Sequence, residues 1–167
     1  MEKKRREKYS VVRTKNSPVK MDSFKGACNL VNEQKICAIT TKKYKLKEHF
    51  GVGLIDTYKF EGLHISIFDI QLWNDVSISG NNNEDYLELN YLLEGEQIVK
   101  IENYKKDIAI ENQECYLAYI SNFEGSVHYH KNKHFKELKI RMSDSFIKRH
   151  HLDSDYQIIK NILSQKL

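Results

Sequence analysis

The feature that most constrains the fold is a series of short β-prone segments between Ile36 and Met142. In Leu87 to Tyr91, apolar and polar residues alternate with a period of two, which places successive side chains on opposite faces of a strand. Segments this short and this regularly spaced predict an antiparallel sandwich or barrel. The expected strands are Ile36 to Thr41, Gly51 to Tyr58, Leu63 to Trp73, Leu87 to Tyr91, Ile98 to Ile101, Ile108 to Ile110, Cys115 to Ile120, Val127 to His130 and Leu138 to Met142.

The pattern becomes helical after Met142. Ser143 or Asp144 can cap a short helix, and Asp153 can cap a second one. Apolar residues share one face of the second helix, so we expect this stripe to be buried against the barrel, a partner chain or both. The stripe consists of Ile159, Ile162, Leu163 and Leu167. The predicted fold is therefore mostly β, a double-sheet antiparallel barrel followed by C-terminal helices.

Charge is distributed unevenly along the 167 residues, a length usual for one domain. Residues 1–20 contain eight Lys or Arg against two Glu, whereas the rest of the chain contains 19 basic and 21 acidic residues. That balance is not typical of a fold that follows nucleic-acid phosphates. We expect a basic arm at 1–20, a β-barrel domain at 21–142 and a helical tail at 143–167. An interaction domain whose arm docks on an acidic partner is one alternative.

The cysteines and the apolar segments bear on the compartment. Cys28, Cys37 and Cys115 are widely spaced and form no Cys-x-x-Cys pair, which disfavours a disulfide framework or a thiolate zinc site. No apolar run has the length of a signal peptide or a membrane span. We therefore expect a cytoplasmic protein with reduced thiols and no membrane partner.

Several segments carry a family resemblance. Leu87 to Glu96, followed by a strand, a polar turn and a second strand, resembles the sensor domain of AraC-family transcription regulators. Gly51-x-Gly53 and Glu61-Gly62-Leu63-x-Ile65-x-Ile67-x-Asp69 are similar to the subgroup associated with siderophore-responsive regulation. The resemblance extends from Lys47 to Leu167. It implies a cupin-like barrel of jelly-roll type that binds a small-molecule effector, and a homodimer formed through the helices that follow.

Regulators of this family contact DNA through two helix-turn-helix units after the barrel and its helices. Only residues 143–167 follow the last expected strand here. The resemblance therefore implies that DNA is bound only through a helix-turn-helix domain missing from this chain. The sequence also departs from the family pattern, with Gln113-Glu114 in place of the usual Gly-Asp and with Ser121 to Glu124 in a loop that often contains a proline.

A histidine cluster is the strongest candidate for metal chemistry. His128 and His130 lie two apart on an expected strand and would project to the same face, and His134 and Glu137 follow. A cupin metal-binding protein or enzyme built on these four residues is the second alternative. However, Lys131-Asn132-Lys133 is typical of a hairpin turn and would separate the two pairs. We therefore expect no metal and no cofactor.

No sequence motif indicates catalysis. The chain has no Gly-x-Ser-x-Gly elbow and no glycine-rich phosphate loop, so we predict no catalytic residue and no enzyme activity.

Aromatic residues are the candidates for the wall of an effector site, because such sites are mostly apolar with a few polar groups. We select Trp73, Tyr91, Tyr119 and His128, each of which can instead fill the core. Arg141 could bind an acidic ligand, but its alternation with Ile140 and Met142 makes an outward direction the expected one.

Overall fold

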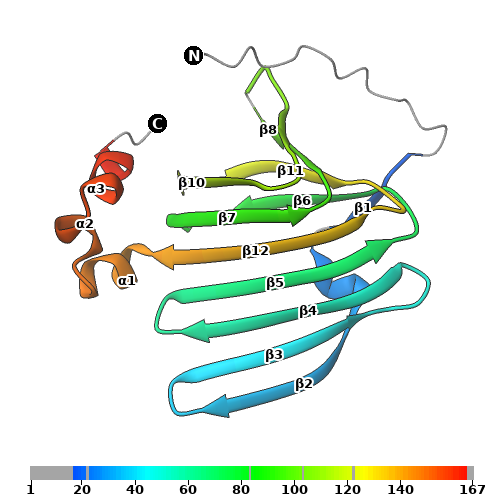
Figure 1. Ribbon diagram of the computed structural model, residues 1–167, viewed down its shortest axis with the longest axis horizontal. Helices are drawn as coiled ribbons and strands as arrows, with labels where there is room; N and C mark the ends of the chain where they lie inside the picture. Colours follow the sequence, from blue (N-terminus) through cyan, green and yellow to red (C-terminus); the bar gives the residue numbers. More distant parts are fainter. Residues whose placement is uncertain (1–16, 22, 83, 103, 122, 165–167) are drawn as a thin grey trace.

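The computed structural model describes residues 17–21, 23–82, 84–102, 104–121 and 123–164. In this part of the chain, twelve strands form two sheets, and three short α-helices follow the last strand. Figure 1 shows the larger sheet running across the molecule, with the helices at one end of it. The predicted fold class, a mostly β double-sheet architecture with C-terminal helices, is confirmed, although the two sheets do not close into a barrel.

The smaller sheet, sheet A, has five strands in the order β1-β6-β11-β8-β9. β1 pairs with β6 in parallel, and the remaining pairs of this sheet are antiparallel. The strands are β1 (Val19–Met21), β6 (Val76–Asn82), β8 (Gln97–Ile101), β9 (Ile108–Ile110) and β11 (Phe123–Tyr129).

The larger sheet, sheet B, has seven strands in the order β10-β7-β12-β5-β4-β3-β2. All its pairs are antiparallel. The strands are β2 (Cys28–Ile36), β3 (Ile39–Leu46), β4 (Gly51–Phe60), β5 (Leu63–Leu72), β7 (Tyr86–Glu94), β10 (Glu114–Ile120) and β12 (His134–Ser143).

The first C-terminal helix begins where the sequence predicts, but the second begins earlier, because its N-cap is His151 and not the expected Asp153. Ser143 is the N-cap of α1 (Asp144–Arg149), because its hydroxyl oxygen accepts a hydrogen bond from the backbone N–H of Phe146 at 3.2 Å. The second predicted helix is divided into α2 (Leu152–Asp155) and α3 (Gln157–Ser164). None of the described helices is long and apolar enough to cross a membrane.

The N-terminal third differs most from the prediction. The single strand expected at Ile36 to Thr41 is wrong, because Cys37 has φ 53° and turns the chain between β2 and β3. β6 has no counterpart among the expected strands. Most of the expected basic arm lies outside the described residues, but Val19 and Lys20 already belong to β1.

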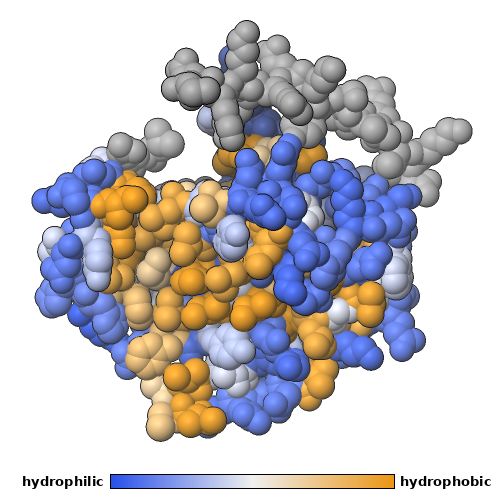
Figure 2. All heavy atoms as spheres, in the orientation of Figure 1, coloured by the Kyte–Doolittle hydropathy of each residue, from blue (hydrophilic) through white to orange (hydrophobic). Residues whose placement is uncertain are grey.

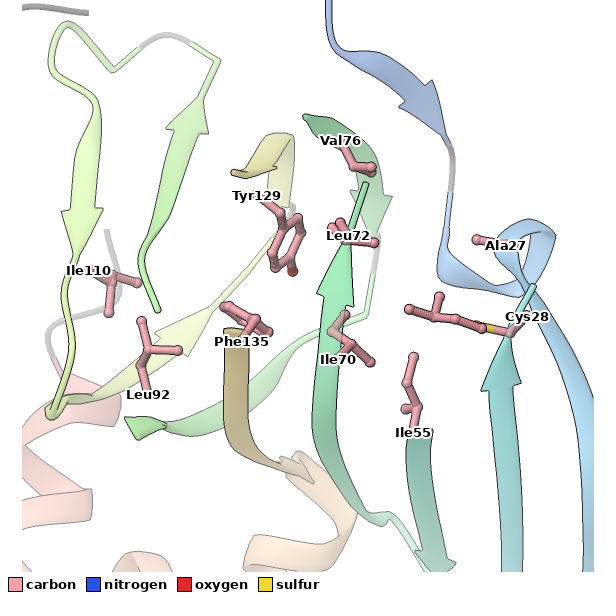
Figure 3. Close-up of a cluster of buried hydrophobic side chains, with 11 residues drawn as sticks. Ala27, Cys28, Ile55, Ile70, Leu72, Val76, Leu92, Ile110, Tyr129 and Phe135 are labelled. Carbon is pink, nitrogen blue, oxygen red and sulfur yellow. The ribbon is translucent and has the colours of Figure 1, made fainter. Parts of the chain in front are cut away.

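The hydrophobic core lies between the two sheets (Figure 3). The rings of Tyr129 from sheet A and Phe135 from sheet B meet edge to face, with centroids 4.9 Å apart. A short 3₁₀ helix, Phe24–Ala27, closes this end and places Phe24 against Tyr129, with ring centroids 5.2 Å apart. Full burial of each large apolar side chain contributes about 1.5–3 kcal/mol.

Apolar side chains also cover the outer face of sheet B. Ile140 on β12 lies between Ile65 on β5 and Leu89 on β7, and Leu117 on β10 continues the row. These four side chains are only partly buried. In Figure 2 apolar surface spreads across this face, beside the polar surface of the helices. The part of the outer face beside the helices is therefore apolar, and polar residues of the same strands point inward.

Candidate functional site: a buried polar cluster between the sheets

The inner face of sheet B becomes polar beyond the hydrophobic core. On β12, Glu137, Lys139 and Arg141 continue the inward series that starts at Phe135. On β7, Asn90 pairs in register with Lys139, and Glu88 pairs with Arg141. Oppositely charged side chains from neighbouring strands thus meet inside the molecule. We call Glu88, Asn90, Gln97, Tyr116, Glu137, Lys139 and Arg141 the polar cluster.

Glu137 is the centre of the cluster and has an exposed fraction of 0%. Its Oε1 accepts hydrogen bonds from Nδ2 of Asn90 at 2.5 Å and from Nε2 of Gln97 at 3.0 Å. The ammonium of Lys139 lies 3.4 Å from the same oxygen. Gln97 belongs to β8 of sheet A, so its hydrogen bond joins the two sheets across the interior.

Glu88 forms the second half of the cluster. Its Oε1 accepts a hydrogen bond from the hydroxyl of Tyr116 at 2.5 Å, and its Oε2 accepts one from Nε of Arg141 at 2.6 Å. Burial opposes ionisation of Glu88, but the charges of Lys139 and Arg141 and these two hydrogen bonds outweigh it and hold its pKa below the usual value. Burial, together with the Glu88 carboxylate, raises the pKa of Tyr116, so the phenol remains a hydrogen-bond donor.

Several buried polar atoms of this face have no hydrogen-bond partner among the described residues. They are Oδ1 of Asn90, Oε1 of Gln97, Oε2 of Glu137 and Nε2 of His64. Burial lowers the pKa of His64 to about 4, assisted by the charges of Lys59 and Arg141, so its imidazole is neutral. A buried polar atom without a partner costs about 1–3 kcal/mol, so each of these atoms favours a bound polar group.

The cluster is closed at one end and accessible at the other. The exposed fraction of the side chain rises from 0% at Glu137 to 13% at Lys139 and 41% at Arg141. Opposite these residues, sheet A contributes Val99 and Val127, which point inward and are only partly buried. The interior therefore combines a polar side on sheet B with an apolar side on sheet A, as in sites for small organic molecules.

The residues selected from the sequence lie elsewhere. Trp73 is 44% exposed at the end of β5, where its Nε1 donates to the carbonyl oxygen of Glu48 at 2.9 Å. Tyr91 lies on the outer face of sheet B, between the inward-pointing Asn90 and Leu92. These two aromatic residues are not near each other along the sheet, and neither belongs to the polar cluster.

Tyr119 and His128 are also separate from the cluster. The hydroxyl of Tyr119 lies 3.1 Å from a carboxylate oxygen of Asp85 and 3.1 Å from one of Asp144, so it connects β10 with the start of α1. His128 lies between the inward-pointing Val127 and Tyr129 and faces away from sheet B, with its Nε2 3.2 Å from the hydroxyl of Ser126.

The candidate metal ligands are not brought together. Glu137 is inside, His128 is on the far face of sheet A, and His134 is on the outer face of sheet B. His130 lies in the turn before β12, where its Nε2 is 3.5 Å from a carboxylate oxygen of Glu96. Within the described ranges, no group of three or more His, Cys, Asp or Glu side chains is arranged to hold a metal ion.

Glu88 and Asn90 were missed, and Arg141 was assigned to the outer face, because the wrong face of the alternating strands was expected to point inward. The alternation in β7 and β12 is present, but the polar residues point inward, and the expectation that Arg141 points outward is wrong. The charges of these strands were an available signal. One strand carries the acidic Glu88 and the other the basic Lys139 and Arg141, and such charges can be buried together when the strands pair.

The fold and the cluster define a mostly β, double-sheet domain with a polar interior. Residues 56–167 match the family model described as the regulatory protein PchR N-terminal domain. The chain therefore belongs to this family of regulatory N-terminal domains. No curated protein matches the chain.

Solved structures of similar fold include a Bacillus halodurans protein, with 14% identity, a TM-score of 0.37, and coverage of 48% of this chain and 62% of that chain. A cupin superfamily protein from Desulfitobacterium hafniense has 16% identity and a TM-score of 0.39, over 68% of this chain and 84% of that one. An ethanolamine utilization protein Q from Salmonella typhimurium has 10% identity and a TM-score of 0.41, over 70% and 95%.

Proposed function

We propose that this chain is the effector-sensing domain of an AraC-type transcription regulator and that the polar cluster is its effector site. The observation that carries the proposal is the path of β12. Glu137, Lys139 and Arg141 lie on this strand, and α1 begins directly after it, without a loop. A ligand that moves the polar cluster would therefore move the start of the helices.

The contacts around the β12–α1 junction support this coupling. The backbone N–H of Ser143 donates to the carbonyl oxygen of Gly62 at 3.0 Å, and Arg149 pairs with Glu61 at 2.5 Å. The β4–β5 turn is thereby tied to both ends of α1. A shift of β12 relative to β5 changes these contacts together, which gives the helices two alternative positions for an effector to select between.

The proposal assigns the remaining roles as follows. The protein acts in the cytoplasm as a homodimer, binds a small-molecule effector and performs no catalysis. DNA is contacted by a helix-turn-helix domain and not by this sensing domain. The sequence segments similar to siderophore-responsive regulators make ferric siderophore complexes the first effectors to test.

Amide hydrogen exchange on the full chain tests the coupling. We compare the wild type with two variants. Arg141→Gln removes the ion pair with Glu88, and Lys136→Gln is a substitution on the same strand. Lys136 faces outward and pairs with Asp69 at 3.2 Å, so it is a matched control. Exchange in α1 should become faster in Arg141→Gln and stay unchanged in Lys136→Gln, because only Arg141 belongs to the polar cluster.

An effector should have the opposite effect. A ferric siderophore that binds the cluster is expected to slow exchange in α1 of the wild type and to have a smaller effect in Arg141→Gln. If amide exchange in α1 changes equally in Arg141→Gln and Lys136→Gln, or changes in neither variant, the polar cluster is not coupled to the helices and the proposal fails.

A further inference from the structure

The structure assigns a chemical class to the effector: we infer that it presents an uncharged hydrogen-bond donor, a hydroxyl or an amide N–H, to three acceptor oxygens around Glu137. This inference rests on the proposed function and specifies the ligand of the same site. The oxygens are Oδ1 of Asn90, Oε1 of Gln97 and Oε2 of Glu137.

The chemistry of a carboxylate determines the orientation of both amides. Oε1 of Glu137 accepts both hydrogen bonds, so Asn90 and Gln97 turn their NH₂ groups toward Glu137. Each amide oxygen is consequently left on the other side of its amide group, without a partner among the described residues. Both amides are anchored on one oxygen of Glu137, and the third open acceptor is the second oxygen of that carboxylate. The three acceptors therefore belong to one small region.

The charges around these oxygens decide which donor fits. A ligand carboxylate or phosphate would place its own oxygens against three acceptors and would be repelled. A metal ion or an ammonium group would compete with Lys139, whose Nζ already lies 3.4 Å from Glu137, and would approach a second cation at Arg141. An uncharged donor satisfies the open oxygens without displacing either charge.

The apolar inner face of sheet A, opposite the three oxygens, favours a ligand whose remaining part is apolar. Val99 extends inward from the same strand as Gln97, two residues further on, and Val127 and Ile78 lie beside it in sheet A. These apolar side chains are only partly buried. A ligand that presents its donor group to sheet B would bury an apolar ring or chain against them, which contributes to affinity in proportion to the area buried.

Four probes with one ring and different head groups test this class. Cyclohexanol and cyclohexanecarboxamide present uncharged donors, whereas cyclohexanecarboxylate and cyclohexylamine are charged at neutral pH. Each is titrated into the full chain labelled with nitrogen-15, and the side-chain amide signals of Asn90 and Gln97 are followed. The neutral probes should shift these signals and bind at least about tenfold more tightly than the charged ones.

Two variants establish which atoms are responsible. Glu137→Gln keeps the size of the side chain but replaces an acceptor oxygen with a donor, so it should weaken the neutral probes about tenfold. Gln97→Met removes one open oxygen and should give a smaller loss. Glu33→Gln, the same substitution on exposed β2, should change nothing. Retention of the wild-type backbone amide spectrum shows that each variant is folded.

Three results would overturn the inference. The first is that the charged probes bind as tightly as the neutral ones. The second is that Glu137→Gln and Gln97→Met bind all probes as tightly as the wild type does. The third is a crystal structure in which a water molecule contacts the three oxygens and no probe displaces it. These results leave the sensing proposal standing, because the effect of Arg141→Gln on α1 is measured without any of these probes.

Discussion

At the scale of single residues, the charges inside the domain are matched one to one. Glu88 is held by Tyr116 from β10 and by Arg141 from β12, while Glu137 is approached by Lys139. Such pairs add little net stability over an apolar core, but removing one partner is costly because the other charge stays buried. Each member of the cluster is thus sensitive to substitution.

Tyr116→Phe tests this sensitivity. The substitution removes the hydroxyl that donates to Glu88 and should lower the free energy of unfolding by about 1–3 kcal/mol. Tyr104→Phe, at a side chain that is 62% exposed, should change it by less than about 0.5 kcal/mol. Urea unfolding of both variants measures the difference, and equal effects would contradict the role given to the Tyr116 hydroxyl.

His134 links three strands on the outer face of sheet B. Its Nδ1 lies 2.7 Å from a carboxylate oxygen of Glu94 on β7, and its Nε2 lies 2.6 Å from one of Asp69 on β5. Hydrogen bonds to Asp69 and Glu94 raise the pKa of His134, and the hydrogen bond from His134 lowers the pKa of Asp69. Lys136 also pairs with Asp69 at 3.2 Å.

The pH dependence of His134→Gln follows from these shifts. A raised pKa in the folded state means that the contribution of His134 is fully present below about pH 6.5 and is lost as the pH rises through the raised value. The lowered pKa of Asp69 means that its contribution is lost as the pH falls below about 3.9. His134→Gln should therefore cost up to about 1 kcal/mol between these limits, a small value because the groups are exposed, and almost nothing at high pH.

Thermal unfolding at about pH 5.5 and about pH 9 measures this difference. His49→Gln, at an exposed side chain that contacts neither Glu94 nor Asp69, is the control. A cost that is independent of pH would show that His134 acts by packing alone.

At the scale of elements, the pairing of β4 with β5 depends on a glycine. Gly53 has φ +127°, and a Cβ atom there would lie 2.2 Å from the carbonyl oxygen of Asp69. The backbone of β4 therefore approaches β5 more closely than any other residue type allows.

Gly53→Ala should lower the free energy of unfolding by more than about 2 kcal/mol, because it combines an unfavourable φ with a backbone clash. Gly26→Ala is the matched control, since a Cβ at Gly26 would make an ordinary contact of 3.7 Å with Cε of Met21. Chemical denaturation compares the two variants. Similar stabilities would mean that β4 can shift to accept a side chain.

At the scale of the whole molecule, the C-terminal helices extend beyond the sheets and leave apolar side chains partly exposed. Ile159, Ile162 and Leu163 on α3 are partly buried, and Leu167 lies outside the described residues. A stripe of this kind suits a two-fold interface in which the same surface meets itself.

We predict that the chain exchanges between monomer and dimer through this stripe. Ile159→Glu should shift the equilibrium to the monomer at least about tenfold, because dimerisation would then bury a charge, whereas Asn161→Glu on the opposite face of α3 should leave it unchanged. Sedimentation across a concentration series measures both variants. A wild type that stays monomeric throughout, or an Ile159→Glu protein that still dimerises, would exclude this helix from the interface.

The hairpins with clear turn residues could be predicted from the sequence. The Glu61-Gly62 turn between β4 and β5, the limits of β9 and the N-cap at Ser143 depend on local conformational preferences and appear as expected. The β2–β3 hairpin could not, because its turn at Cys37 contains neither glycine nor asparagine and Ile36 to Thr41 favours an extended chain.

The sequence alone also determined that apolar and polar side chains of β7 and β12 point to opposite faces, because the backbone of a strand turns successive side chains to opposite sides. Which face is inside was decided only by the tertiary structure. Sheet A covers the polar side of these strands. Glu88 can be buried there because Tyr116 and Arg141 bind it. Glu137 can be buried because Gln97 and Lys139 bind it, as does Asn90, which is buried with it. A buried charge is stable only beside its partner, and the partner's position depends on how the strands are ordered in the sheets rather than on any local pattern.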